Sequence, residues 1–345
     1  MHDTAGRVLV VGPSWVGDMV MSQVLYRHLH QHRPQLQLDV LAPAWSAPIL
    51  QRMPEVKRAI ALPFGHGEIK LAERRRLGVQ LRETAYEQAI VLPNSLKSSL
   101  VPFFANIPLR TGWRGEMRYG LLNDLRLLDK QALPLMVQRF AALGMPASAP
   151  MPEVLPVPCL QVDTAAAHQA REKFSIAAGQ PLLALCPGAE FGAAKRWPAG
   201  HFAELAGQYL RRGWQVVLFG SDNDRPVCAR ISEANGANGV CTDLAGHTSL
   251  AEAVDLLSLA SAVVSNDSGL MHIAAALQRP LVAIYGPTSP GFTPPQGTRA
   301  ALQVSAIDCA PCFQRECPLG HHRCMRDMSP ETVVAALEDL MLESG

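Results

Sequence analysis

Short apolar runs of four to seven residues recur along the chain, separated by longer mixed segments. The runs are rich in Val, Ile and Leu, which is typical of strands buried on both faces of a parallel sheet. We expect strands at residues 7–12, 36–42, 58–62, 89–92, 109–112, 182–186, 215–219, 240–244, 262–265 and 280–285. We expect helices at residues 19–32, 45–53, 68–84, 95–105, 161–174, 201–212, 225–235, 250–260, 270–278 and 332–343. This alternation predicts an open α/β fold.

The chain is long enough for two such sheets, because it has 345 residues and single cores stop growing at ~250–300 residues. Five prolines between Pro146 and Pro158 make the clearest change in composition, and we interpret them as the start of a linker. We therefore predict two Rossmann-like domains, at residues 1–160 and 161–328, which face a central cleft lined by the carboxyl ends of both sheets. A closing helix at 329–345 begins with Ser329, Pro330 and Glu331, a strong helix start.

The segment 262–295 is the one around which we expect the rest to be organised. It contains a short strand, the turn Asn266-Asp267-Ser268-Gly269, a helix and a second strand. The turn then lies at the amino end of a helix, where unpaired N–H groups and the helix dipole favour an anion. His272, one turn into the helix, could add a ring donor. The alternative is that Asp267 only caps the helix, but we favour a phosphate site.

The first strand leads into Gly12-Pro13-Ser14-Trp15-Val16-Gly17-Asp18. This loop is not a dinucleotide fingerprint, because G-x-G-x-x-G is absent and Pro43, in place of an acid, ends the second strand. Asp18 at the mouth of the sheet suits a general base. An N-cap role for Asp18 is about as well supported by the local sequence alone.

Two further loops carry polar residues at the ends of strands. Residues 187–198 contain Gly188, Glu190 and the cation Lys195, but no P-loop pattern. Lys195 is placed to neutralise a phosphate, and a solvated charge is the alternative. Gly220 is followed by Asp222-x-Asp224, which superficially matches a metal-binding D-x-D pattern. After a strand of the second domain, such an acid more often accepts hydrogen bonds from a ribose.

Composition and charge narrow the class of protein. No apolar run approaches the ~20 residues that cross a bilayer, and the start lacks a signal peptide, so we expect a cytoplasmic protein with reduced cysteines. The net charge is +1. Residues 1–160 nevertheless hold 18 Lys and Arg against 12 Asp and Glu, whereas the remainder holds 13 against 18. This imbalance hints that the first half meets an anionic partner.

Several stretches together resemble the lipopolysaccharide heptosyltransferases, a family of glycosyltransferases. They are GPSWVGDMVM (12–21), LPNSLKSSLVPFF (92–104), RTGWRGEMRYGLLND (110–124), PGAEFGAAKRWP (187–198) and NDSGLMHIAAAL (266–277). The resemblance spans nearly the whole chain. It implies a GT-B fold, with an acceptor domain, a nucleotide-sugar domain and a final helix that packs back on the first. It also implies a metal-independent, inverting transfer of a heptose from ADP-heptose to the first heptose of the lipopolysaccharide inner core.

The resemblance also implies roles for individual residues. Asp18 matches the family's base, Lys195 its phosphate-binding lysine and Asp224 its ribose acid. Asp267, Ser268, Gly269 and His272 match the pyrophosphate turn, and Thr248 lies where the adenine is held. The implied partners are ADP-heptose and heptosyl-Kdo2-lipid A at the inner membrane surface, with no nucleic acid and no catalytic cofactor.

A phosphorylated, carboxylated acceptor suits the basic first half of the chain. Our candidates for its binding are Asn94, Lys97, Arg114, Arg118, Lys70 and Arg74. Each cation alone is better explained as a solvated surface charge.

Four of the eight cysteines remain, in the pattern Cys309-x2-Cys312-x4-Cys317-x6-Cys324, with His321 and His322 among them. In a reducing compartment, this spacing suggests one structural site of four thiolates for zinc or iron. Four ordinary thiols on a loop are the alternative. We expect loss of such a metal to leave the pyrophosphate turn intact.

Three other functions are weighed. An NAD-dependent oxidoreductase would explain two α/β domains, but the failed fingerprint disfavours it. A non-catalytic metal-binding protein would explain only the cysteines. Within the family, the main alternative function is transfer of the first heptose, or of a later one, to the inner core.

Overall fold

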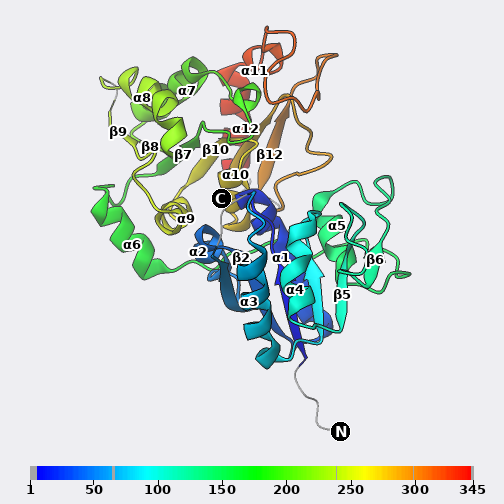
Figure 1. The fold of residues 1–345 in the computed structure, drawn as a ribbon. Coiled ribbons are helices and arrows are strands. Elements are labelled where there is room, and N and C mark those ends of the chain that lie inside the picture. The colour runs from blue at the N-terminus through cyan, green and yellow to red at the C-terminus, as the bar shows by residue number, and fades with distance from the viewer. Residues whose placement is uncertain (1–5, 64–66, 238, 298, 343–345) are drawn as a thin grey trace. The chain divides into compact units, whose positions relative to one another are not determined.

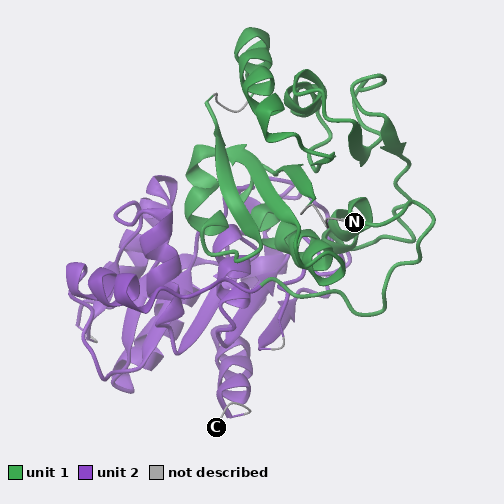
Figure 2. Cartoon of the chain, turned by 90° about the horizontal axis from the view of Figure 1, so that it is seen from below, with its two compact units in different colours: residues 1–158 green, residues 159–345 purple. Residues whose placement is uncertain are grey.

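The computed structural model describes residues 6–63, 67–237, 239–297 and 299–342. The chain divides into two compact units, Met1–Pro158 and Cys159–Gly345 (Figures 1 and 2). Each unit contains one six-stranded sheet in which every neighbouring pair is parallel. The predicted α/β class with two Rossmann-like domains is confirmed.

The first unit is built on a sheet with the order β3-β2-β1-β4-β5-β6. Its strands are β1 (Arg7–Val11), β2 (Gln37–Pro43), β3 (Val56–Leu62), β4 (Gln88–Val91), β5 (Leu109–Trp113) and β6 (Asp124–Arg126). Its helices are α1 (Val16–His32), α2 (Ala47–Leu50), α3 (Leu71–Leu81), α4 (Leu100–Phe104) and α5 (Met136–Leu143). Leu9 and Val11 of β1 pack with Leu81 of α3 and Val101 of α4 in one core. The strand order reverses between β1 and β4, so the loops after these strands flank the usual ligand crevice of such a sheet.

The second unit repeats this architecture with the order β12-β11-β10-β7-β8-β9. Its strands are β7 (Leu182–Cys186), β8 (Gln215–Leu218), β9 (Cys241–Asp243), β10 (Ala262–Asn266), β11 (Leu281–Tyr285) and β12 (Ala300–Val304). Its helices are α6 (Thr164–Lys173), α7 (Ala199–Arg211), α8 (Arg225–Glu233), α9 (Leu250–Ser258), α10 (Gly269–Ala276), α11 (Arg323–Arg326) and α12 (Pro330–Leu342). Here the order reverses between β7 and β10, so the loops after these two strands mark the crevice.

The closing helix α12 packs within the second unit. Val333, Val334 and Leu337 join the core formed by β7, β8 and α7, and α12 contacts α7, β11 and β12. The packing of residues 329–345 on the first domain, which the resemblance implied, stays a prediction. It would have to use a face of α12 other than the buried one.

Several elements differ from the sequence-based expectation. We predicted none of β6, β12, α5 and α11. Helix α1 begins at Val16, three residues before the expected start, with Trp15 as its N-cap. The alternative role of Asp18 as N-cap is therefore wrong, since Asp18 lies inside the first turn. Among the described residues, no helix is both long and apolar enough to span a bilayer.

Candidate functional site

In the second unit, an ion pair joins the loop after β7 to the loop after β10. Lys195 ends a short 3-10 helix (Ala193–Lys195) in the loop after β7, and its Nζ lies 2.6 Å from Oδ2 of Asp267 after β10. The same oxygen accepts a hydrogen bond of 2.7 Å from the hydroxyl of Thr288, in the loop after β11. Three loops that follow neighbouring strands thus converge on one carboxylate, which fixes the ammonium group at the end of the sheet.

The backbone of these loops is held by Asn266, the last residue of β10. Its side-chain oxygen accepts from the amide of Trp197 at 3.1 Å, and its side-chain nitrogen donates to the carbonyl of Pro187 at 2.7 Å. Asn266 is fully buried, where unpaired polar groups are costly. These two bonds clamp both ends of the Lys195 loop onto the β10 turn.

The turn itself opens helix α10 as the sequence predicts, but with a different cap. Ser268 is the N-cap and its hydroxyl accepts from the amide of Met271, whereas Asp267 binds Lys195 and Thr288. The alternative of Asp267 as the cap is therefore wrong. Gly269 is the first helical residue, so the free N–H groups at the amino end of α10 begin two residues after Asp267, the partner of Lys195.

His272 lies one turn into α10 and is buried. Burial lowers the pKa of His272 to about 4, with Lys195 acting in the same direction and Asp267 opposing it. The imidazole is therefore neutral at physiological pH. It can orient a ligand by hydrogen bonding, but it adds no positive charge.

Asp224 is buried and already paired inside the second unit. Its Oδ2 accepts from the amide and hydroxyl of Ser221, at 3.0 and 2.8 Å, and its Oδ1 accepts from Arg196 at 3.2 Å. A Cβ at Gly188 would overlap the Asp224 carboxylate, so the loops after β7 and β8 touch at this point. Asp222 pairs instead with Arg225 at 3.1 Å. The D-x-D acids are thus held by basic and polar side chains.

The other predicted donor residues lie on loops that follow strands of the same sheet. Gly220 follows β8 and contacts the Asp224 side chain closely enough that a Cβ would not fit. Glu190 is exposed in the loop after β7, and Thr248 is partly exposed just before α9.

In the first unit, two of the predicted acceptor-binding arginines are buried. Arg118 is fully buried and donates to the carbonyls of Pro93 and Trp113 and to the side chain of Asn94. Arg74 donates to the carbonyls of Glu68, Ile69 and Lys97. Both guanidinium groups therefore tie together loops at the carboxyl edge of the sheet.

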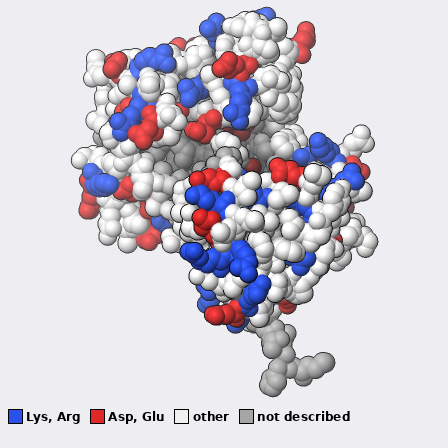
Figure 3. All heavy atoms as spheres, in the orientation of Figure 1, with Lys and Arg blue, Asp and Glu red and all other residues white. Residues whose placement is uncertain are grey.

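The remaining candidates of the first unit are accessible. Asn94, Arg114 and Lys70 are exposed, while Lys97 and Asp18 are partly buried. Figure 3 shows a run of Lys and Arg over the part of this unit where Figure 1 places α3.

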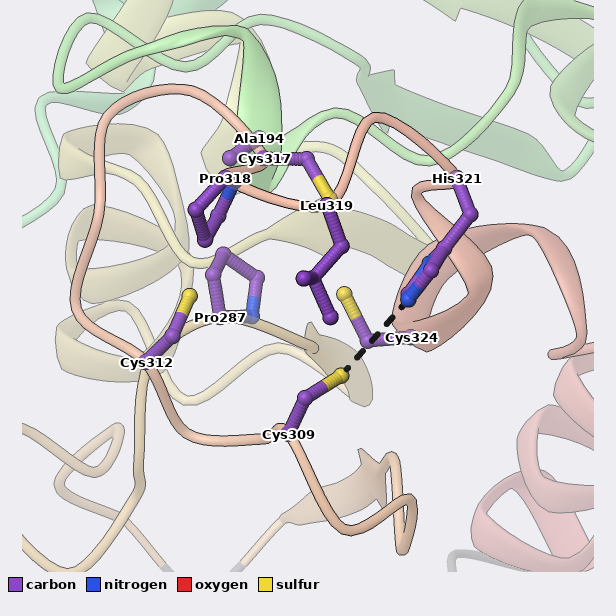
Figure 4. A pocket seen from close by; sticks show the side chains of 9 residues that line it. All are labelled: Ala194, Pro287, Cys309, Cys312, Cys317, Pro318, Leu319, His321 and Cys324. Carbon is purple, nitrogen blue, oxygen red and sulfur yellow. Dashed lines mark hydrogen bonds between the residues drawn. The ribbon is translucent and has the colours of Figure 1, made fainter.

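The four clustered cysteines line one cavity together with His321, Ala194 and Pro287 (Figure 4). Sγ of Cys309 lies 4.0 Å from Nε2 of His321. All four are thiols, a donor set that suits zinc or iron. As the side chains stand, however, no group of three or more His, Cys, Asp or Glu in the described part of the chain is arranged to hold a metal ion. The four predicted thiol ligands therefore line one cavity, but their side chains are not arranged to coordinate an ion.

Sequence reasoning missed Thr288, Asn266 and Arg196 as parts of the site. Thr288 follows β11 in the segment Gly286-Pro287-Thr288. Polar residues directly after parallel strands were the signal used for the other loops, and the same rule would have found it.

A lysine, a helix start and a buried acid lie on the loops after β7, β8 and β10 of the second unit, an arrangement that suits a phosphate-containing nucleotide ligand. The chain belongs to glycosyltransferase family 9 (heptosyltransferase), whose family model matches residues 74–323.

Individual relatives agree with this assignment. Lipopolysaccharide heptosyltransferase 2 of Salmonella typhimurium is 51% identical, over 98% of this chain and 99% of its own length. The solved structure of E. coli ADP-heptose LPS heptosyltransferase II is 49% identical and superposes with a TM-score of 0.89 over 98% of this chain and 99% of that one. This match confirms the expected GT-B-like fold. Lipopolysaccharide heptosyltransferase 1 of Pseudomonas aeruginosa is 28% identical, over 97% of this chain and 98% of its own length.

Proposed function

We propose that this glycosyltransferase moves L-glycero-D-manno-heptose from ADP-heptose to the first heptose of the lipopolysaccharide inner core. The observation that carries the proposal is the identity of 51% to a heptosyltransferase 2 over nearly the full length of both chains. Transfer of the first heptose, which is the runner-up, is supported by an identity of only 28% to a heptosyltransferase 1.

The second unit supplies the donor site in this proposal. ADP leaves with negative charge developing on its β-phosphate, and Lys195 together with the amino end of α10 stabilises that charge. The pairing of Lys195 with Asp267 at 2.6 Å holds the ammonium in position before the donor arrives. Neutral His272 and the hydroxyl of Ser268 orient the ligand by hydrogen bonds.

The nucleoside end of the donor is assigned to Gly220, Asp224 and Thr248, with Gly188 and Glu190 at the loop beside them. Both carboxylate oxygens of Asp224 already accept hydrogen bonds. A ribose hydroxyl would therefore add to this network by using a remaining lone pair or by displacing Arg196.

The first unit supplies the base. Asp18 removes the proton from the acceptor hydroxyl while that oxygen attacks the anomeric carbon, and ADP departs from the opposite face. A single displacement of this kind inverts the configuration at that carbon.

Acceptor binding is assigned to the accessible polar residues of the same unit: Asn94, Lys97, Arg114 and Lys70. Arg74 and Arg118 act indirectly, because their buried guanidinium groups position the loops that carry Lys97 and Asn94. The acceptor proposed here, heptosyl-Kdo2-lipid A, lies at the surface of a membrane. We accordingly place the enzyme at the cytoplasmic face of the inner membrane, as a peripheral protein.

The cysteine cavity is proposed to bind a structural zinc or iron ion, because four thiols and an imidazole line it. The side chains would close around the ion on binding. Protein purified without chelator is then expected to carry about one equivalent of thiolate-bound metal per chain. Elemental analysis that finds no metal, with all four thiols titrating in the folded protein, would exclude the site.

Donor specificity tests the proposal at its first step. ADP-heptose at about 100 times its dissociation constant should stabilise the protein by ~3 kcal/mol, and NAD at the same concentration should not. Stabilisation by NAD with none by ADP-heptose would favour the oxidoreductase alternative instead.

A further inference from the structure

The cysteine-rich segment, residues 309–324, directly contacts the loop that carries Lys195. The amide of Ala194 donates a hydrogen bond of 3.0 Å to the carbonyl of Arg315. A Cβ at Gly192 would overlap that same carbonyl and the main chain around it. Gly192 has an extended backbone (φ 162°), so its lack of a side chain serves this close approach and not an unusual conformation.

The same segment also contacts the loop that carries Thr288. The amide of Phe313 donates to the carbonyl of Pro287 at 2.7 Å, one residue before Thr288. Gly286, one residue earlier still, has no room for a Cβ because the side chains of Met325 and Cys324 lie against it. Figure 4 shows Ala194 and Pro287 among the cysteines at the wall of the cavity.

A third contact joins the segment to Lys195 through an aromatic ring. The ammonium of Lys195 lies 4.8 Å from the centroid of Phe191, and the guanidinium of Arg315 lies 5.4 Å from the same centroid. Cations this close to a ring are attracted by its π-face. Phe191 therefore links the side chain of Arg315 to that of Lys195.

The two loops that the segment contacts hold the same carboxylate, that of Asp267. Lys195 and Thr288 are the two side chains that hold Oδ2 of Asp267, and the cysteine-rich segment supports the loops of both. We propose that residues 309–324 form a positioning element of the donor-phosphate site, with Arg315 as its principal contact. The proposal rests on the donor site described under Proposed function, and it deepens that function by tying phosphate affinity to the order of this segment.

The proposal revises one expectation. From the sequence alone, we expected loss of a metal at the cysteines to leave the pyrophosphate turn intact. The contacts of Ala194 and Pro287 indicate instead that disorder in 309–324 would release Lys195 and Thr288. Since a charged hydrogen bond to phosphate depends on the placement of its donor, affinity for ADP should fall while affinity for adenosine does not.

Gly192→Ala tests this coupling without changing any group that touches the donor. Its control is Gly200→Ala, in α7, where a Cβ meets nothing within 4 Å. We expect Gly192→Ala to weaken ADP binding by roughly tenfold, to raise the KM for ADP-heptose more than it lowers kcat, and to leave adenosine binding within about twofold. Gly200→Ala should match the wild type in all three.

A second variant, Gly286→Ala, disturbs the contact on the Thr288 side and should act in the same direction. It keeps the test decisive if Gly192→Ala fails to fold. Unchanged ADP affinity in a folded Gly192→Ala or Gly286→Ala protein would overturn the proposal, as would an equal loss for ADP and adenosine. Failure of the proposed donor site is distinguishable, because the wild-type protein itself would then not bind ADP; failure of the proposed acceptor alone would leave wild-type ADP binding intact.

Discussion

The side-chain nitrogen of Lys195 lies 2.6 Å from Oδ2 of Asp267, a residue 72 positions further along the chain. Both side chains are largely buried, at 13% and 6% exposure. A buried ion pair contributes little net stability, because desolvation offsets much of the attraction. Its effect here is to hold one ammonium group in place at the end of the sheet, where an anionic ligand gains most from it.

Removing this ammonium group should weaken binding of the phosphate-containing ligands and leave binding of the nucleoside unchanged. We expect Lys195→Ala to weaken ADP and ADP-heptose by roughly tenfold to a hundredfold, the range for a charged hydrogen bond. Adenosine binding, measured by calorimetry, should change little. Lys173→Ala is the control, because that lysine pairs with Glu252 at an exposed site. An equal loss for all three ligands would mean that Lys195 serves the fold.

Thr288 should contribute to ADP affinity through its hydroxyl, which donates a hydrogen bond to Asp267. Thr288→Val keeps the shape of the side chain and removes the donor, which should weaken ADP by about fivefold, the equivalent of ~1 kcal/mol. Thr288→Ser keeps the hydroxyl and should restore most of the affinity. The idea fails if Ser and Val variants bind ADP equally.

Asp18 should be needed for turnover but not for binding of the sugar donor. Asp18→Asn is expected to reduce kcat by ~10²–10⁴-fold, the range for loss of a general base, while ADP affinity stays close to that of the wild type. Glu153→Gln, at an exposed position, controls for the change in charge. Near-normal turnover in Asp18→Asn would remove the assignment.

His272 should make stability depend on pH. Its pKa is lowered by burial from 6.5 to about 4, so the unfolded chain binds a proton that the folded chain does not between these values. The stabilisation is therefore fully present above pH 6.5 and is lost as the pH falls towards 4.

This dependence can be measured against a variant that does not titrate. Between pH 7 and pH 5, the wild type should lose about 2 kcal/mol more of its unfolding free energy than His272→Gln. Urea unfolding at the two pH values gives the difference. Parallel losses in both proteins would show that His272 is not buried in neutral form.

Most of the fold could be predicted, because a parallel strand buried on both faces leaves an apolar run in the sequence. The exceptions follow from the same rule. Strand β6 has only three residues, and β12 lies at the edge of its sheet, where Leu302 and Val304 are exposed. Neither strand has the continuous apolar run that revealed the buried central strands.

The site could be predicted only where a residue follows the carboxyl end of a strand. That rule brought Lys195 and Asp267 to the same crevice, but their direct contact depends on the path of a long loop. Arg74 and Arg118 were taken for surface cations because buried arginines are rare. Their burial depends on backbone carbonyls supplied by distant loops, which no local pattern records.

The central claim is that this chain adds a heptose to an inner core that already carries one. Its most direct test is incubation with ADP-heptose and purified acceptors that carry zero, one or two heptoses, followed by mass spectrometry of the products. We predict a mass increase of a single heptose on the acceptor that starts with one, and little or no product on the others. Efficient transfer to the acceptor without heptose, and none to the acceptor with one, would contradict the claim.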